Sequence, residues 1–175
     1  MRALLAIICI TASSWAHSDE LFYGEIHGGI GNIQIADLAF RPLEAHVSVG
    51  GYFLKNIGID LTVGGALRDD SDDSFDTQLD DVASLSLRFD SPPSNGISAF
   101  ILIGVSRFSV SQEGINPFGV STTVNETFQG ATAALGFKRQ IAGTRFSFVG
   151  VYRVHFVDEP IDVDNYSFGV RAAWE

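Results

Sequence analysis

The sequence predicts an all-β protein, an eight-stranded antiparallel up-and-down transmembrane β-barrel that follows an N-terminal signal peptide. Three observations support this fold: an apolar run at the start, eight segments in which residue character alternates with a period of two, and connections that are alternately long and short. A period of two places every second side chain on the same face of a strand. The composition agrees, because 46% hydrophobic and 18% charged residues are too apolar a mixture for a disordered chain.

Residues 1–16 are predicted to be a secretory signal peptide. Met1-Arg2 supplies a positive start, and Ala3 to Ile10 forms an unbroken apolar run. Small residues then precede a cut that we place after Ala16. A buried N-terminal helix is the alternative, and the run is short and has no cap after it.

Residues 17–175 form the predicted barrel domain, with no linker and no second domain in the pattern. The cut removes Cys9, the only cysteine, so the mature chain has no disulfide and no thiolate nucleophile. It also removes Arg2, which moves the net charge from −10 to −11 and argues against nucleic acid as a partner. No later stretch approaches the roughly 18 apolar residues of a spanning helix. An exported chain of this kind is either soluble or spans an outer membrane as a closed barrel.

The first four predicted strands each carry a larger apolar face and a smaller or polar face. The outward sets are Gly24, Ile26, Gly28 and Ile30; Ala45, Val47, Val49, Gly51 and Phe53; Ile57, Ile59, Leu61, Val63, Gly65 and Leu67; and Ala83, Leu85, Leu87 and Phe89.

The last four predicted strands follow the same rule, except that residues 97–109 are apolar on both faces. For that strand we favour Ala99, Ile101, Ile103 and Val105 outward, which places Gly104 and Ser106 inside. The other outward sets are Ala131, Ala133, Leu135 and Phe137; Phe146, Phe148, Gly150, Tyr152 and Val154; and Tyr166, Phe168, Val170, Ala172 and Trp174.

The connections fall into two classes that alternate along the chain. The short ones are 54–56, 91–96 and 139–144, and the long, polar ones are 31–44, 69–81, 110–125 and 157–164. Outer-membrane barrels keep short turns in the periplasm and long loops outside. We therefore expect the long connections to be extracellular and both ends of the barrel to be periplasmic.

The identity of the two faces decides between a membrane barrel and a soluble one. The large apolar side chains suit lipid, and the small and charged side chains suit the narrow interior of an eight-stranded barrel. We expect Glu25, Asp60 and Asp90 to pair inside, because a lone charge there is costly. Their candidate partners are Arg68, Arg88, Lys138, Arg153 and Arg171. A soluble lipocalin-like barrel with an apolar pocket is the alternative.

The strand pattern and the C-terminal segment resemble the small outer-membrane barrels of the OmpA/OmpX type. Those barrels end in a strand with a polar residue, a glycine two positions later and an aromatic five positions after that, as in Ser167, Gly169 and Trp174. Two departures are Ala172, where a bulky residue is usual, and Glu175 after the aromatic. The resemblance implies a monomer in the outer membrane of a Gram-negative bacterium. It also implies contact with membrane lipid and lipopolysaccharide, and with the barrel-assembly machinery through the last strand.

Two groups of residues offer candidate chemistry. His46 and Ser48 form a His-x-Ser pair, similar to that of outer-membrane lipid A deacylases, but on the second strand and facing inward. Asp80-Asp81, with His155 and Asp158, lies near strand ends at the long-loop rim, similar to the acidic pairs of omptin proteases. The first pair has no orienting third group in the sequence, and the second needs convergence across the mouth.

Two further motifs are weaker. The connection 69–81 holds seven aspartates and no base, a donor set that suits Ca²⁺, but it lacks the EF-hand pattern. Asn125-Glu126-Thr127 matches a glycosylation sequon, which has no general meaning in a bacterial outer membrane. We assign no catalytic, cofactor-binding or metal residue and expect no cofactor. The expected function is a non-enzymatic structural or surface-interaction role carried by extracellular loops. The alternatives are a soluble periplasmic ligand-binding barrel and an outer-membrane enzyme acting on lipid A or peptides.

Overall fold

The structure is a computed structural model that describes residues 21–35, 38–68, 70–72, 75–115, 121–156 and 161–174. The predicted signal peptide and its cleavage site lie outside these residues. The strands are β1 Phe22–Ile35, β2 Leu38–Phe40, β3 Leu43–Leu54, β4 Ile57–Arg68, β5 Asp70–Asp72, β6 Phe75–Asp90, β7 Ile97–Ile115, β8 Ser121–Gln140, β9 Phe146–Phe156 and β10 Ile161–Trp174. Within the described ranges, no helix is long and apolar enough to cross a membrane.

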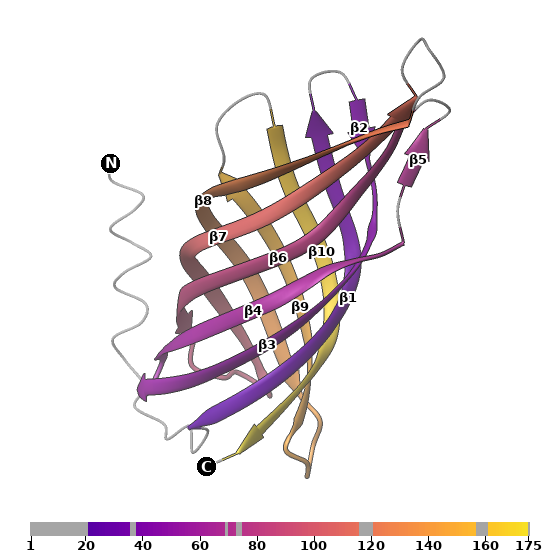
Figure 1. Cartoon of the computed structure of the whole chain (residues 1–175). Coiled ribbons are helices and arrows are strands. Elements are labelled where there is room, and N and C mark those ends of the chain that lie inside the picture. The colour runs from indigo at the N-terminus through magenta and orange to yellow at the C-terminus, as the bar shows by residue number, and fades with distance from the viewer. Residues whose placement is uncertain are drawn as a thin grey trace, which may run out of the picture.

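Eight of the strands form a closed antiparallel barrel, as the sequence predicts (Figure 1). Each long strand pairs with the next, and β10 pairs with β1 from Phe22↔Trp174 to Ile35↔Ile161. β2 and β5 are short additions that pair with β1 and β6. Among the described residues, the closure leaves no open edge in the apolar part of the wall, where every strand is paired on both sides.

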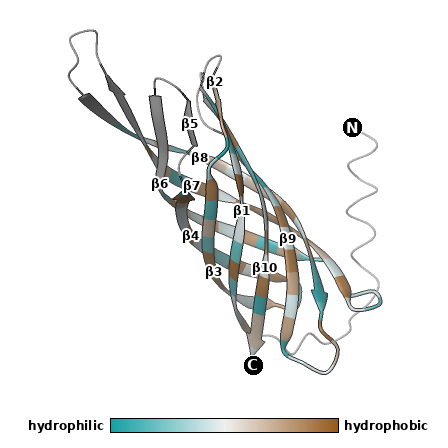
Figure 2. Ribbon diagram, turned by 90° about the vertical axis from the view of Figure 1, so that its right-hand side faces the viewer, coloured by the Kyte–Doolittle hydropathy of each residue, from teal (hydrophilic) through white to brown (hydrophobic). Residues whose placement is uncertain are grey.

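The outer wall is apolar, and the predicted facing of the strands is confirmed. Figure 2 shows hydrophobic and hydrophilic residues alternating along the strands. On β7 the ambiguous parity resolves as expected, with Ile101, Ile103 and Val105 exposed and Ser106 buried. Trp174 and Phe168 also face outward, with 47% and 68% of their surfaces exposed. An exterior of this kind is suited to lipid rather than to water.

The apolar belt has the height of a membrane. On β7 it runs from Ile97 to Val105 and is followed on the same face by the exposed Arg107. Nine residues at ~3.3 Å each, tilted by about 40°, span roughly 23 Å, close to the ~25 Å apolar band of outer-membrane barrels. Tyr152 and Tyr166 stack on the outer wall with ring centroids 4.5 Å apart.

The three short connections lie at one end of the barrel, together with the first residue of β1 and the last residue of β10 (Figure 1). The turn between β6 and β7 closes on Asn95 and Gly96, whose φ angles are 52° and 75°. Positive φ at both positions is the requirement of a type I′ hairpin turn, which Asn-Gly satisfies best. Ser94 and Ile97 exchange both main-chain hydrogen bonds across it, at 2.8 and 3.0 Å.

The prediction that the long connections are loops is wrong for much of their length, because strand pairing continues into them. β1 extends to Ile35 and is met by β2, and β5 pairs with the start of β6. β7 and β8 remain paired as far as Ile115↔Ser121. Above the belt both faces of a strand meet water, so the apolar–polar alternation disappears although the hydrogen-bond ladder does not.

Candidate functional site

Side chains in three layers fill the interior of the barrel, and the charged layer lies at the end with the short turns. The charged layer is centred on Arg88, which is fully buried. Its guanidinium donates to Asp90 at 2.7 Å and to Glu25 at 3.0 Å. It also lies over the Phe100 ring, 3.7 Å from the centroid. This cation therefore joins strands from opposite parts of the wall.

Arg171 and two tyrosines complete the charged layer. Arg171 donates to Glu25 at 3.3 Å and to the Tyr52 hydroxyl at 3.1 Å, and its guanidinium lies over the Tyr23 ring. Tyr23 donates to Asp60 at 2.7 Å. Tyr52 donates to Asp90 at 2.8 Å. Each tyrosine thus satisfies a carboxylate with its hydroxyl and lies under the Arg171 guanidinium with its ring.

The charges inside the described part of the barrel balance. The carboxylates are Glu25, Glu44, Asp60 and Asp90, and the cations are Arg88, Lys138, Arg153 and Arg171. Lys138 reaches Asp90 at 3.2 Å. The predicted network is confirmed for the three predicted carboxylates. Arg68 is exposed and does not belong to it.

The polar layer lies above and contains the same motif on two neighbouring strands. In β1, His27 Nε2 lies 2.9 Å from a Glu25 carboxylate oxygen, and in β3, His46 Nε2 lies 2.9 Å from a Glu44 oxygen. The two histidines stand directly opposite each other in the β1–β3 ladder. Glutamate two residues before histidine puts both side chains on one strand face. That spacing is a signal by which the sequence could have shown these pairs.

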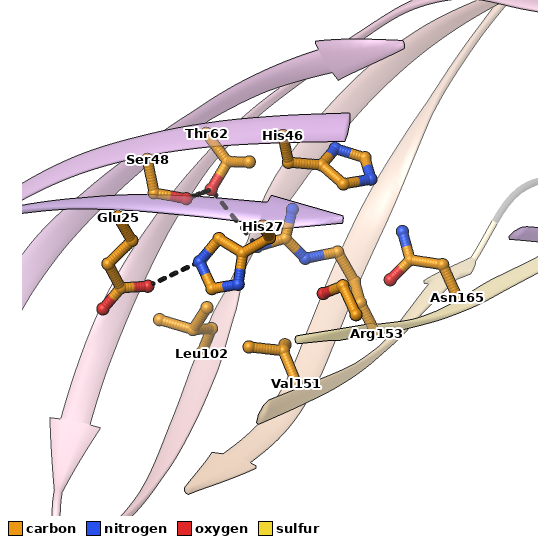
Figure 3. A pocket seen from close by; sticks show the side chains of 10 residues that line it. Glu25, His27, His46, Ser48, Thr62, Leu102, Val151, Arg153 and Asn165 are labelled. Carbon is orange, nitrogen blue, oxygen red and sulfur yellow. Dashed lines mark hydrogen bonds and ion pairs between the residues drawn. The ribbon is translucent and has the colours of Figure 1, made fainter. Parts of the chain in front are cut away.

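A small cavity remains in the polar layer (Figure 3). Its volume is about 10 Å³, room for about one water molecule, and polar side chains on β1, β3, β4, β9 and β10 contribute to its lining. Arg153 crosses the layer and donates to Ser84 and Thr62, each at 3.2 Å. Asn165 donates to Glu44 at 3.2 Å. Hydrogen bonds in this layer thus join β9 to β4 and β6, and β10 to β3.

The apolar layer closes the far end of the lumen. Its buried members are Ile33, Phe40, Val82, Phe108, Val110 and Val163. A second apolar cluster of Phe100, Leu102, Ala134 and Val149 lines the β7–β9 side lower down. The interior thus holds apolar side chains as well as the small and charged ones that the sequence analysis emphasised, and the apolar side chains lie toward the mouth.

Large interior side chains face glycines on the neighbouring strand. Tyr23 packs over Gly50, His46 lies opposite Gly64, and Phe100 lies opposite Gly136. Small barrels commonly alternate small and large residues in this way to fill a tapering lumen. The glycines of the pattern are thus part of the packing of the interior.

His46 and Ser48 do not form a nucleophile–base pair. The Ser48 hydroxyl bonds the Thr62 hydroxyl at 2.8 Å, and His46 is held by Glu44. Glu44 is the orienting group that sequence reasoning missed, because it was assigned to a connection. All three residues are buried in the lumen.

The candidate protease residues at the long-loop rim, Asp80-Asp81, His155 and Asp158, do not form a common site in the part of the chain that the structure describes. His155 is buried, with Nδ1 2.8 Å from the Ser106 hydroxyl, and Asp81 is exposed on the outer face. Asp158 and the side chain of Asp80 lie outside what the structure describes. No three His, Cys, Asp or Glu side chains among the described residues gather in a way that could hold a metal ion.

Of the acidic connection 69–81, the backbone of Asp70–Asp72 forms β5, and Phe75 begins β6. The Ca²⁺ interpretation falls on side chains outside the described residues. Asn125 of the sequon lies on β8 and accepts a hydrogen bond from Ser111 at 2.7 Å. This contact gives it a structural role in the β7–β8 hairpin.

Neither a family model nor a curated protein matches the chain. Solved structures do match its fold. Neisserial surface protein A is 13% identical, covers 87% of this chain and 97% of its own, and has a TM-score of 0.66. Ail of Yersinia pestis is 12% identical, covers 89% and 99%, and also scores 0.66. OprG of Pseudomonas aeruginosa is 11% identical, covers 91% and 98%, and scores 0.62.

These matches cover nearly the whole length of each chain. Their sequence identities of 11–13% support a similar fold and nothing more. They agree with the closure, the apolar belt and the strand number described above. The chain has the fold of the small eight-stranded outer-membrane β-barrels.

Proposed function

We propose that the protein is a non-enzymatic outer-membrane barrel that acts at the cell surface through the extracellular part of its sheet. The observation that carries this proposal is the filled lumen. Among the described residues, the cavity in the polar layer has a volume of only about 10 Å³, and buried charged and apolar side chains occupy the lumen on either side of it, which supports a lumen that conducts no solute. A barrel without a conduit and without an accessible catalytic group has its remaining functional surface outside the membrane.

The part of the sheet above the apolar belt offers that surface. We define the ribbon as residues 70–72, 75–81, 109–115 and 121–127, the mutually paired parts of β5, β6, β7 and β8 that lie beyond Arg107. Figure 1 shows β7 and β8 running toward β5, away from β9 and β10. A hydrogen-bonded ribbon presents a more rigid surface than loops of the same length.

The partners follow from this placement. Lipid contacts the belt, lipopolysaccharide surrounds the ribbon, and the barrel-assembly machinery recognises the last strand, which ends at the outward-facing Trp174. We expect the protein to act as a monomer, since its own strands close the barrel and no second chain is needed to complete it. Ail has been crystallised with the heparin analogue sucrose octasulfate. The ribbon has no Lys or Arg in its sequence, so a polyanion of that kind is not the ligand we expect here.

Two measurements test the proposal. An epitope tag after Ser74 should be reached by antibody on intact cells, and a tag between Pro93 and Ser94 should be reached only after the outer membrane is opened. Inverted accessibility would reverse the topology, and no accessibility of either tag would favour the soluble periplasmic alternative. Planar-bilayer recordings of the purified barrel should show no stable, large conductance, and such a conductance would refute the filled lumen.

A further inference from the structure

The end of the barrel with the short turns (Figure 1) exposes positive charge on its outer surface. Arg139 and Arg145 are both exposed there. The carboxylates nearest to this end belong to the charged layer, where they are buried and paired with arginine or lysine. Asp19, Glu20 and Glu175 fall outside the described residues. The described outer surface at this end therefore carries cations without an exposed carboxylate.

Arg139 lies on the outer wall at the edge of the apolar belt. In the sheet it stands directly opposite Ile97 of β7 and Phe148 of β9. Both neighbours are apolar and exposed on the same face. Directly opposite residues have Cβ atoms about 5 Å apart. The aliphatic part of the arginine is therefore placed to cover apolar surface while its guanidinium reaches into the headgroup region of a membrane.

Arg145 approaches the same part of the wall from the turn between β8 and β9. Its guanidinium lies 5.8 Å from the centroid of the exposed Phe146 ring. Phe146 and Phe148 are two residues apart in β9, so both rings lie on one face of the strand. Arg139 and Phe146 are thus diagonal neighbours, which places them about 7–8 Å apart. Two guanidinium groups therefore flank one pair of phenylalanine rings.

The chemistry of this cluster selects an anionic amphiphile. The side chains of Arg139 and Arg145 have no hydrogen bond or ion pair with any other described residue. A guanidinium offers a planar set of donors that matches the oxygens of a phosphate. The adjoining phenylalanine rings suit hydrocarbon, so the ligand must carry its phosphate next to acyl chains. A headgroup with an additional amine would be disfavoured, because like charges repel.

We propose that Arg139 and Arg145 bind the phosphate of an anionic phospholipid, of the phosphatidylglycerol type, on the outer wall of the β8–β9 hairpin. The two guanidinium groups hold the phosphate, and Phe146 and Phe148 pack against the first methylene groups of the acyl chains. This inference rests on the proposed function, because the cluster meets phospholipid only where the barrel spans the outer membrane with its short turns on the periplasmic side.

Trp174 is placed to report the binding. It faces outward on β10, and the N–H of the preceding Ala173 donates to the Arg145 carbonyl at 3.1 Å. The purified barrel is reconstituted in phosphatidylcholine vesicles that contain either brominated phosphatidylglycerol or brominated phosphatidylcholine, since bromine quenches a tryptophan that it contacts. Each cation beside an anionic headgroup favours association about fivefold. We expect brominated phosphatidylglycerol to quench Trp174 with at least a tenfold higher apparent affinity, and equal quenching by the two lipids would overturn the proposal.

Two variants of the protein provide the matched comparison. Arg139→Gln with Arg145→Gln removes both charges and keeps polar side chains of similar length. Arg107→Gln removes an exposed arginine from the outer wall at the opposite edge of the belt. We expect the double variant to lose the preference for phosphatidylglycerol and Arg107→Gln to keep it. An equal loss in both would show general surface attraction and contradict the site, and heat-modifiable migration on a gel verifies that each barrel is folded.

Two further results separate the alternatives. Inorganic phosphate in excess should leave the quenching by brominated phosphatidylglycerol in place, because the ion lacks the acyl chains that contact the rings. Displacement of the lipid by phosphate would identify a site for the free ion and overturn the inference. An accessible tag after Ser74 together with equal quenching by both lipids would remove the inference and leave the proposed function. An inaccessible tag would remove the proposed function whatever the lipids do in vesicles.

Discussion

Replacing Arg88 tests whether the charged layer stabilises the barrel. Arg88→Met keeps much of the side-chain volume over Phe100 and removes the cation that Glu25 and Asp90 share. The balance of four carboxylates and four cations inside the barrel then becomes four to three. Breaking a buried pair by removing one partner costs about 3–5 kcal/mol. We expect the lower end, about 3 kcal/mol, because Glu25 retains Arg171 and Asp90 retains Lys138.

Urea unfolding in phospholipid vesicles measures this loss. Trp174 is the only tryptophan downstream of the predicted cleavage site, so its fluorescence reports the closing strand without labelling. A loss of about 3 kcal/mol corresponds to a roughly hundredfold change in the unfolding equilibrium, at 1.4 kcal/mol per tenfold change. Adding Glu25→Gln to Arg88→Met should recover part of the loss, because it restores the balance inside the barrel to three carboxylates and three cations.

The matched control is Arg139→Met, an exposed arginine near the same end of the barrel. Surface substitutions of this kind change stability by about 0.5 kcal/mol or less. If Arg88→Met were as mild as Arg139→Met, the buried network would not be what holds the lower lumen together. The layer would then be explained by packing alone.

Three further predictions concern packing, assembly and the second Glu-x-His pair. Gly104→Ala places a Cβ against the Leu85 carbonyl and should cost about 1–3 kcal/mol by overpacking, whereas Gly28→Ala meets nothing within 4 Å and should be neutral or slightly stabilising in the same urea titration. Trp174→Ser should lower the amount of barrel found in isolated outer membranes, since aromatic residues anchor barrel ends at the interface, and unchanged levels would contradict a role in assembly. Glu44→Ala leaves His46 and Asn165 without their shared acceptor and should cost about 1–3 kcal/mol, with an unchanged midpoint arguing against the pair.

The sequence predicted the barrel wall well because lipid and lumen impose opposite demands on alternate residues. Ile26 and Glu25, neighbours in the chain, lie outside and inside because one suits hydrocarbon and the other needs a partner. Where both sides of the strand meet water, as in residues 110–125, that contrast vanishes. The sequence then resembled a loop although the structure pairs Val110 with Glu126.

The contacts inside the lumen were only partly predictable. Parity placed Arg88, Asp90 and Glu25 on the inner face, but which cation meets which carboxylate depends on strand register across the barrel. Arg88 and Glu25 are 63 positions apart in the chain and lie on strands that are not adjacent in the sheet. The Glu44–His46 pair was accessible in principle, since two residues of spacing on one strand need no register.

The seam between β1 and β10 has a consequence for how the molecule comes together. Phe22 pairs with Trp174, so the first and last strands of the described chain must find each other across almost its whole length. Closing so long a loop is entropically costly, and folds dominated by such distant contacts form slowly. Until β10 arrives, both β1 and β9 expose a row of unpaired main-chain groups. Pairing of β10 with β1 and β9 therefore covers both exposed edges in one step and converts an aggregation-prone open sheet into a closed barrel.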